Sequence, residues 1–412
     1  MQTPSNPTPT DVEDLSLPPA PRPLASIRRY DLDWLRIIAI LTLLFYHTGM
    51  IYVSWGWHIQ SAETSQVFEN VMRWLHRWRM PLLFFISGAG TYFALNRRPK
   101  GNASSSPLPR YAWERTKRLF FPLVFGMFVI VPPQIYFEWL FRGRFTGSYA
   151  GFYPSVFDFV PYEDGGTGGA FSWHHLWFVA YLFLYSLISI PVFRWLRTAG
   201  GQRFTDRIGR LITRPGGALW LMGLAILASQ YLTRPFYPDE THALLNDWAY
   251  FVENLLLFWF GYVLISRRSF WQVLTDQRRI FLAATVVFTL VLYGMRMGYT
   301  PQEIDDLFWV DFTYFTNGQC LMIASVLATI AYGYKYLNVD RPILPKLNEA
   351  VYPFYILHQT VIVGIGYYLL QTGLGVYSGF LVISLLSLII CVSLYLLLIR
   401  PFKLTRFLFG MK

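Results

Sequence analysis

The stretch RRYDLDWLRIIAILTLLFYHTGM, residues 28–50, joins a basic flank to a long apolar run. A run of about 20 mostly apolar residues is long enough to cross a bilayer as an α-helix. Two side chains depart from that pattern: Arg36 at the near edge of the run and His47 deep inside it. Titratable groups are costly in a membrane helix unless they face a cavity or a partner, so both residues indicate a functional site.

The composition of the whole chain also indicates a membrane protein. Of its 412 residues, 54% are hydrophobic and 14% are charged, whereas soluble domains are about a quarter charged. Both cysteines, Cys320 and Cys391, lie in apolar runs, so we expect no disulfide framework. Residues 1–26 are rich in Pro, Ser and Thr. We therefore expect a disordered cytoplasmic tail at 1–26, one transmembrane domain at 27–405 and a short cytoplasmic tail at 406–412.

Ten apolar segments predict an all-α fold, a polytopic transmembrane helical bundle of about ten spans. We expect these spans near residues 35–54, 80–96, 119–138, 175–193, 217–233, 248–266, 279–296, 317–337, 350–371 and 377–399. The second and fifth segments are short, so they are the weakest members of the set.

Charge alternates between the two sides of these segments. With the N-terminus inside, most of the 35 Lys and Arg residues fall in the inner segments, while acidic clusters at 163–164, 239–240 and 303–306 fall in the outer ones. The positive-inside rule then places both termini in the cytoplasm. The net charge of +11 therefore reflects topology. We expect a multi-pass protein of the cell inner (cytoplasmic) membrane, with lipids and no nucleic acid as partners.

Arg36 and His47 are separated by close to three helical turns. Their spacing leaves about 20° between the two side chains and about 16 Å of rise along an α-helix, so both point the same way. Asp33 lies one turn before Arg36 on much the same face. His47 is either a packing residue that bonds to a neighbouring helix or a reactive imidazole in a polar channel. Arg36 either reaches the membrane surface or lines that channel.

Two further elements lie near the inner half of the predicted bundle. Arg115 and Arg118 precede the third segment, where they either anchor to lipid headgroups or bind a diphosphate at a cytoplasmic entrance. Ser87 is followed by Gly88 in the second segment. Small residues let helices approach closely, so packing is the favoured interpretation of Ser87, and a place in the cavity lining is the alternative.

His174 and His175 open the fourth segment at its outer end. Adjacent histidines in a helix diverge by about 100° and no third ligand is evident, so we expect no metal site here. An interfacial position is the first interpretation, and contact with a polar acceptor is the second. His358, in the ninth segment, either lines the same cavity as His47 or bonds to a neighbouring helix.

Glu253 and Asn254 lie about as deep below the outer edge of the sixth segment as His47 does in the first. This matched depth predicts that Glu253 is a carboxylate near His47, with Asn254 in the cavity lining. The alternative is a capping or interfacial role for Glu253.

Several motifs, in this order, resemble those of the integral-membrane acyltransferase 3 family, and within it the branch of glucan-modifying, succinyl-transferring enzymes. The resemblance covers about residues 27–405, and its most telling element is the spacing of Arg36 and His47. The matching stretches are YDLDWLRIIAILTLLFYH, MPLLFFISG, RTKRLFFPLVFG, IVPPQIY, HHLWFVAYLF and YPFYILH.

This resemblance implies ten core helices, an acyl-CoA donor bound from the cytoplasm and an extracytoplasmic carbohydrate acceptor. It implies a central catalytic role for His47 and a donor-site role for Arg36, and Arg115 and Arg118 match the family's basic element after the second span. No tightly bound cofactor is expected, and acetyl-CoA or succinyl-CoA is the donor substrate.

We therefore predict a membrane-bound O-acyltransferase that acylates a hydroxyl of a carbohydrate such as a glucan. His47 acts either as general base or as nucleophile. The alternative function is a polytopic transporter of an acylated or lipid-linked sugar, with His47 and Glu253 as a proton relay. The oligomeric state, the acyl group and the acceptor stay open at this point.

Overall fold

The computed structural model describes residues 28–96, 107–163 and 167–411. The expected tail at 1–26 lies outside these residues. The described chain is helical apart from one short antiparallel hairpin, β1 (Tyr162–Glu163) with β2 (Thr167–Gly168). The all-α prediction is thus confirmed.

Seven helical segments of the described chain are long and apolar enough to cross a membrane. Three of them are single helices: α11 (Trp248–Ile265), α13 (Arg278–Gly298) and α15 (Phe308–Tyr336). Three others each continue into a short terminal helix: α1 (Tyr30–Gly49) into η2 (Met50–Tyr52), α16 (Leu344–Leu369) into η7 (Leu370–Thr372), and α17 (Val376–Leu394) into η8 (Tyr395–Ile399). The seventh segment, Leu108–Phe141, runs from α3 (Pro107–Arg115) through η3 (Thr116–Phe120), α4 (Phe121–Phe125) and η4 (Gly126–Ile130) to α5 (Pro132–Phe141).

Two bent helix pairs raise the number of candidate spans to at most nine. The first is η6 (His174–Leu176) and α7 (Trp177–Ile188) with α8 (Ile190–Leu196), bent by 48°, and the second is α9 (Ala199–Ile212) with α10 (Gly217–Thr233), bent by 116°. The remaining helices are α2 (Gln66–Asn96), α6 (Tyr149–Phe152), η5 (Tyr153–Asp158), α12 (Arg268–Asp276), α14 (Pro301–Asp306) and α18 (Lys403–Leu408).

The predicted span at 80–96 is the second half of α2, which is 31 residues long and is not among these candidates. Its first half carries Glu69, Arg73 and Arg77, so too little of the helix is strongly apolar. The structure therefore supports seven to nine spans, and the number ten stays a prediction, as does the side on which each terminus lies.

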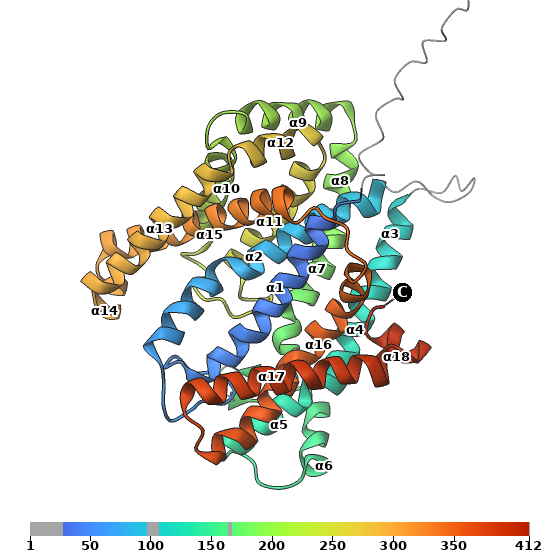
Figure 1. Cartoon of the computed structure of the whole chain (residues 1–412), viewed down its shortest axis with the longest axis vertical. Helices are drawn as coiled ribbons and strands as arrows, with labels where there is room; N and C mark the ends of the chain where they lie inside the picture. The colour runs from blue at the N-terminus through green and yellow to red at the C-terminus, as the bar shows by residue number, and fades with distance from the viewer. Residues whose placement is uncertain (1–27, 97–106, 164–166, 412) are drawn as a thin grey trace, which may run out of the picture.

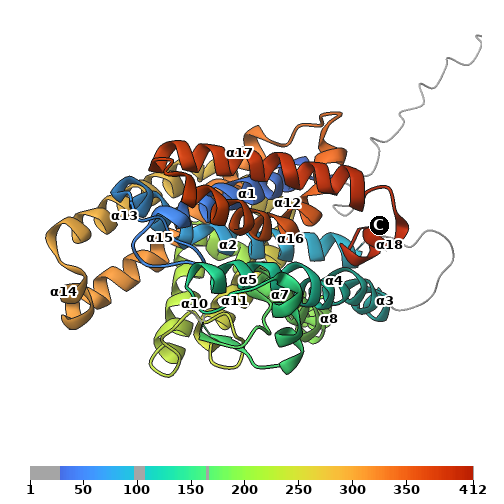
Figure 2. The same cartoon turned by 90° about the horizontal axis from the view of Figure 1, so that it is seen from below.

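α1 and α2 run through the middle of the bundle in both views (Figures 1 and 2). α2 packs against α11 at backbone distance. A side-chain carbon added at Gly88 would lie 1.9 Å from the Phe258 carbonyl oxygen, and one at Gly261 would lie 2.0 Å from that of Phe85. Only glycine allows so close a contact between two helices. The packing interpretation of Ser87 itself stays a prediction.

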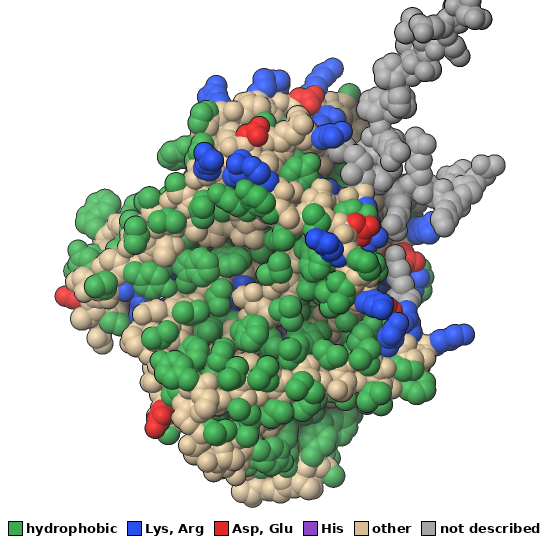
Figure 3. All heavy atoms as spheres, viewed as in Figure 1, with side chains coloured by type: hydrophobic (Ala, Val, Ile, Leu, Met, Phe, Trp, Pro, Cys, Tyr) green, Lys and Arg blue, Asp and Glu red, His purple; other side chains and the backbone are tan. Residues whose placement is uncertain are grey.

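The surface carries broad apolar areas, with Lys and Arg gathered over α9 and α12 and near α3 and α18 (Figure 3). α13 and α17 expose large apolar side chains such as Leu290 and Ile389, which suits contact with lipid acyl chains. At the C-terminal end, Phe409 is buried and its ring lies 5.5 Å from that of Phe125, so the described part of 406–412 packs on the bundle.

Candidate active site

Five of the chain's seven histidines gather in one place, which we call the histidine cluster: His47, His58, His174, His175 and His358. His47 lies in α1, His58 in the loop after η2, His174 and His175 in η6, and His358 in α16. The ring centroid of His358 lies 5.2 Å from that of His47 and 5.3 Å from that of His175. The His58 ring stacks on the His174 ring with a centroid distance of 4.9 Å.

His47 and His358 are the pair with the most open hydrogen-bonding capacity. His358 is fully buried, and its Nδ1 lies 2.6 Å from the Tyr355 carbonyl oxygen. A carbonyl only accepts, so Nδ1 carries the proton and the neutral ring leaves a lone pair on Nε2. Within the described residues, neither His358 Nε2 nor His47 Nδ1 has a hydrogen-bond partner. The two rings together can therefore accept and pass on a proton.

His175 is held from both sides of its ring. Its Nε2 donates to the Ile356 carbonyl oxygen at 3.0 Å, and its Nδ1 lies 3.3 Å from the side-chain nitrogen of Gln134. The Tyr355 hydroxyl donates to the His175 carbonyl oxygen. Both ring nitrogens are thus engaged, so His175 links η6 to α16 and positions its neighbours rather than exchanging protons.

His58 and Glu138 form a buried imidazole–carboxylate pair that the sequence analysis did not identify. His58 Nδ1 lies 2.6 Å from Glu138 Oε2, and Gln359 places its side-chain nitrogen 2.9 Å from His58 Nε2. The fully buried Glu138 also accepts from Arg142 Nε and from the Tyr162 hydroxyl, each at 3.0 Å. This arrangement fixes the orientation and tautomer of the ring. Glu138 ends the third predicted segment, and that position was its only signal in the sequence.

His58, Glu138 and His174 are also close enough to hold a metal ion, since their ligand atoms all lie within 4.8 Å of one another. The hydrogen bonds favour another arrangement. Glu138 already accepts from His58, Arg142 and Tyr162, and His174 Nδ1 lies 2.7 Å from the Ser172 hydroxyl. A metal would displace several of these bonds, so the expectation of no metal site is retained as a prediction.

The predicted donor residues meet around the end of α2. Arg36 Nη1 lies 3.1 Å from Asn348 Oδ1 and 3.5 Å from Asp33 Oδ1. Arg115 donates to the Thr91 hydroxyl at 3.1 Å, and its charge interacts with that of Arg36. Two guanidinium groups in this arrangement are suited to phosphate oxygens.

Arg118 lies in η3 beside this basic group. Its charge and that of Arg115 both act on the buried Tyr352 hydroxyl. A side-chain carbon added at Gly410 would lie 2.6 Å from the Arg118 carbonyl oxygen, so the C-terminal segment packs closely against Arg118. Arg118 therefore belongs to the same region as Arg115.

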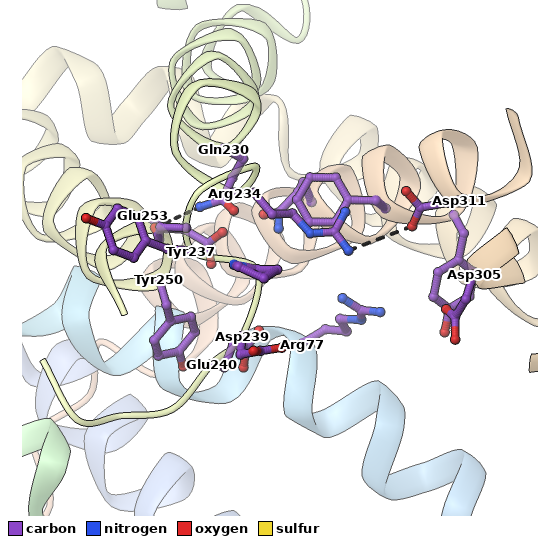
Figure 4. Close-up of a pocket in the computed structure, with 15 residues that line it drawn as sticks. Arg77, Gln230, Arg234, Tyr237, Asp239, Glu240, Tyr250, Glu253, Asp305 and Asp311 are labelled. Atoms are coloured by element: carbon purple, nitrogen blue, oxygen red, sulfur yellow. Dashed lines mark hydrogen bonds and ion pairs between the residues drawn. The ribbon is translucent and has the colours of Figure 1, made fainter. Parts of the chain in front are cut away.

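Glu253 lines a polar pocket of about 150 Å³, whose lining includes no residue of the histidine cluster. Figure 4 shows Glu253 at one end of this pocket and Asp311 at the other, where Arg234 Nη2 lies 3.7 Å from Asp311 Oδ1. Within the described residues no hydrogen bond or ion pair joins Glu253 to His47, so its catalytic role stays a prediction. The pocket is lined by Arg77, Gln230, Arg234, Tyr237, Pro238, Asp239, Glu240, Ala249, Tyr250, Glu253, Asp305, Asp311, Tyr314, Phe315 and Gln319.

The two other predicted lining residues have local partners. Asn254 is buried in α11 and donates to the Tyr250 carbonyl oxygen at 3.0 Å. Ser87 is half-buried, and its carbonyl oxygen accepts from the Thr91 hydroxyl at 3.0 Å. The structure brings neither of them into the histidine cluster.

The loop that leads into α11 is held by Asp247, outside the spans. Asp247 is fully buried, and its Oδ2 accepts from the Tyr181 hydroxyl at 2.6 Å and from the His242 backbone N–H at 3.0 Å. Burial raises the pKa of Asp247 to about 7, because a low-dielectric site disfavours the charged form. The same loop carries Glu240, which lines the pocket.

Comparison with known proteins adds the chemistry to this geometry. The family model described as "Acyltransferase domain", of the acyltransferase 3 type, matches residues 29–396. The chain is similar to the glucans biosynthesis protein C of Salmonella paratyphi B, Salmonella dublin and Salmonella enteritidis, with 23% identity over 408 residues, or 97% of each chain. No solved structure matches. The chain therefore belongs to the acyltransferase 3 family and is a multi-pass membrane acyltransferase.

Proposed function

We propose that the protein transfers an acyl group, acetyl or succinyl, from cytoplasmic acyl-CoA to a hydroxyl of an extracytoplasmic carbohydrate such as a glucan. The observation that carries the proposal is the state of His47. Its imidazole is half-buried on the same helix as Arg36, and its Nδ1 has no hydrogen-bond partner among the described residues. The similarity to the Salmonella glucans biosynthesis protein C supports a glucan as the acceptor.

The proposed path solves a problem of charge. The nucleotide of acyl-CoA is too highly charged to enter the bilayer. Arg36 and Arg115, with Arg118 beside them, hold its phosphates at the inner end of α1. The uncharged arm then reaches along α1 to His47, over a rise of about 16 Å. The protein would lie in the cytoplasmic membrane with both termini inside.

Two routes then lead to the ester. As general base, His47 takes the proton of the acceptor hydroxyl while the oxygen attacks the thioester carbon; the C–S bond then breaks, and the protonated imidazole gives this proton to the CoA sulfur, which leaves as the thiol. As nucleophile, His47 first displaces CoA, whose sulfur takes up the ring proton, and forms an acyl-imidazole; the sugar oxygen then attacks its acyl carbon, the C–N bond breaks, and the hydroxyl proton returns to the imidazole. In both routes, the Nε2 lone pair of His358, which has no partner among the described residues, would accept a hydrogen bond from the protonated His47 ring.

The acceptor would approach from the outer side of the cluster. His174 stacks on His58 there, and its Nε2 has no partner among the described residues, so it is placed to bind a sugar hydroxyl. His358 and His175 complete this wall. Ser87, Asn254 and Glu253 are retained as predicted contributors that lie outside the cluster.

The test is release of free CoA by purified protein in nanodiscs, given an acyl-CoA and a glucan. His47→Gln should lower turnover by about 10²- to 10⁴-fold, the usual contribution of a general base. His242→Gln, the same substitution at a histidine that stacks on Trp177 outside the cluster, should retain most of the activity. Near-normal CoA release by the His47 variant would show that His47 has another role. A transporter would move the sugar without cleaving any thioester.

A further inference from the structure

Arg79 is a buried cation without a carboxylate. It lies in α2 with 7% of its surface exposed. Its guanidinium carbon lies 3.5 Å from the centre of the Tyr46 ring. In the parts of the chain that the structure describes, Arg79 has no hydrogen bond or ion pair, and its Nε is buried without a partner.

A guanidinium in this state is expensive to bury, because it has left water without gaining an opposite charge. Contact with an aromatic face compensates only in part. Two carboxylates of this region have other partners: Glu138 pairs with His58, and Glu240 lies 3.3 Å from His76. The five N–H donors of Arg79 are thus available for an anionic ligand.

Arg79 is also close to the reaction centre. Tyr46, whose ring it covers, precedes His47, and the two rings meet edge to face at 5.2 Å. The charge of Arg79 acts on both His47 and His358. An anion bound by Arg79 therefore lies beside the imidazole pair, at a distance from the basic group around Arg36.

We propose that Arg79 binds the terminal carboxylate of a dicarboxylic acyl group, such as succinyl, and so selects the donor. This inference rests on the proposed acyl transfer. Three C–C bonds separate the carboxylate carbon of a succinyl group from its thioester carbon, a span of about 4 Å. A carboxylate held by Arg79 thus presents the thioester carbon to His47. The planar fork of arginine matches both carboxylate oxygens.

The experiment compares succinyl-CoA with butyryl-CoA, which has the same chain length and no charge, as donors for the nanodisc-embedded enzyme with a glucan acceptor. Arg79→Gln should lower kcat/KM for succinyl-CoA by about 100-fold or more and leave that for butyryl-CoA unchanged or higher. Arg79→Lys should fall in between. The matched control is Arg73→Gln on the same helix, whose guanidinium lies over Trp55 and which should leave the ratio of the two donors unchanged.

A parallel loss with both donors would overturn the proposal, because it would show that Arg79 stabilises the fold or the oxyanion of every acyl transfer. If the Gln variant does not fold, the donor ratio of Arg79→Lys decides, and a ratio equal to that of the wild type overturns it. A wild-type enzyme that uses acetyl- or butyryl-CoA but not succinyl-CoA would refute this inference alone. If no donor gave CoA release, the proposed function itself would fail.

Discussion

At the residue scale, substitution of Glu138 tests whether the His58 ring must be held in its orientation for catalysis. The carboxylate holds His58 by a 2.6 Å hydrogen bond and should act as a positioning residue. We expect Glu138→Gln to lower kcat by about 10- to 100-fold, less than loss of the base itself, with little change in KM for acyl-CoA. Because no metal is expected, wild-type turnover should survive incubation with EDTA.

Activity that EDTA removes and added Zn²⁺ restores would contradict this assignment and favour a metal at His58, Glu138 and His174. Gln134→Glu is a useful companion variant. Combined with Glu138→Gln, it places a carboxylate at residue 134, whose side-chain nitrogen lies 3.3 Å from His175 Nδ1 and 2.7 Å from the Thr360 hydroxyl. This relocated carboxylate should not restore the lost turnover.

Single residues differ in how far the sequence can identify them, and the reason is the cost of polarity in lipid. His47, His175 and His358 stand out because they interrupt apolar runs. His58 lies in a polar loop, where an imidazole is not buried in lipid and therefore does not stand out in the sequence as a functional candidate. The prediction for Glu253 rested on a depth matched to that of His47 in the sequence. Depth along the membrane normal does not fix the lateral position of a helix, so the approach of the two residues stays a prediction.

At the element scale, α2 shows the limit of reading spans from hydropathy. The apolar half at 80–96 was predicted, yet the helix begins at Gln66. Its polar half is retained as helix because Arg77 faces the polar pocket and Arg79 faces Tyr46. Arg79 is the last residue before the apolar run at 80–96. In the sequence it reads as a charge at the edge of a span, so hydropathy alone does not predict its burial.

The contact of α2 with α11 gives a prediction for the bundle. Gly88→Ala introduces a carbon 1.9 Å from the Phe258 carbonyl oxygen. Backbone atoms cannot yield as a flexible side chain can, so the two helices must separate, at a cost of about 1–3 kcal/mol. We expect a lower midpoint of thermal unfolding in detergent.

The matched control is Gly223→Ala in α10, where an added carbon meets no atom within 4 Å and the helix should gain slightly in stability. If the Gly88 variant unfolded at the same temperature as the Gly223 variant, the close approach of α2 and α11 would not exist in the membrane.

At the scale of the whole molecule, the proposal depends on which way the bundle faces. The donor site at Arg36 and the histidine cluster lie toward opposite ends of α1, so an inverted protein would offer its basic entrance to the wrong compartment. The gathering of Lys and Arg over α9, α12, α3 and α18 (Figure 3) supports the predicted orientation through the positive-inside rule.

Single cysteines at exposed positions test this orientation directly. Arg203 lies in α9, Glu63 between α1 and α2, and Gln302 in α14, and all three are exposed. With the cytoplasmic side at α9, a membrane-impermeant maleimide should label Glu63→Cys and Gln302→Cys in spheroplasts, and should label Arg203→Cys only after permeabilisation. The native Cys391 is buried and Cys320 is partly buried, so the unsubstituted protein gives the background. If only Arg203→Cys were labelled in spheroplasts, the bundle would have the inverted orientation, with acyl-CoA at the histidine end. If Gln302→Cys were labelled and Glu63→Cys were not, the two residues would lie on opposite sides, which would mean that α2 does not cross the membrane.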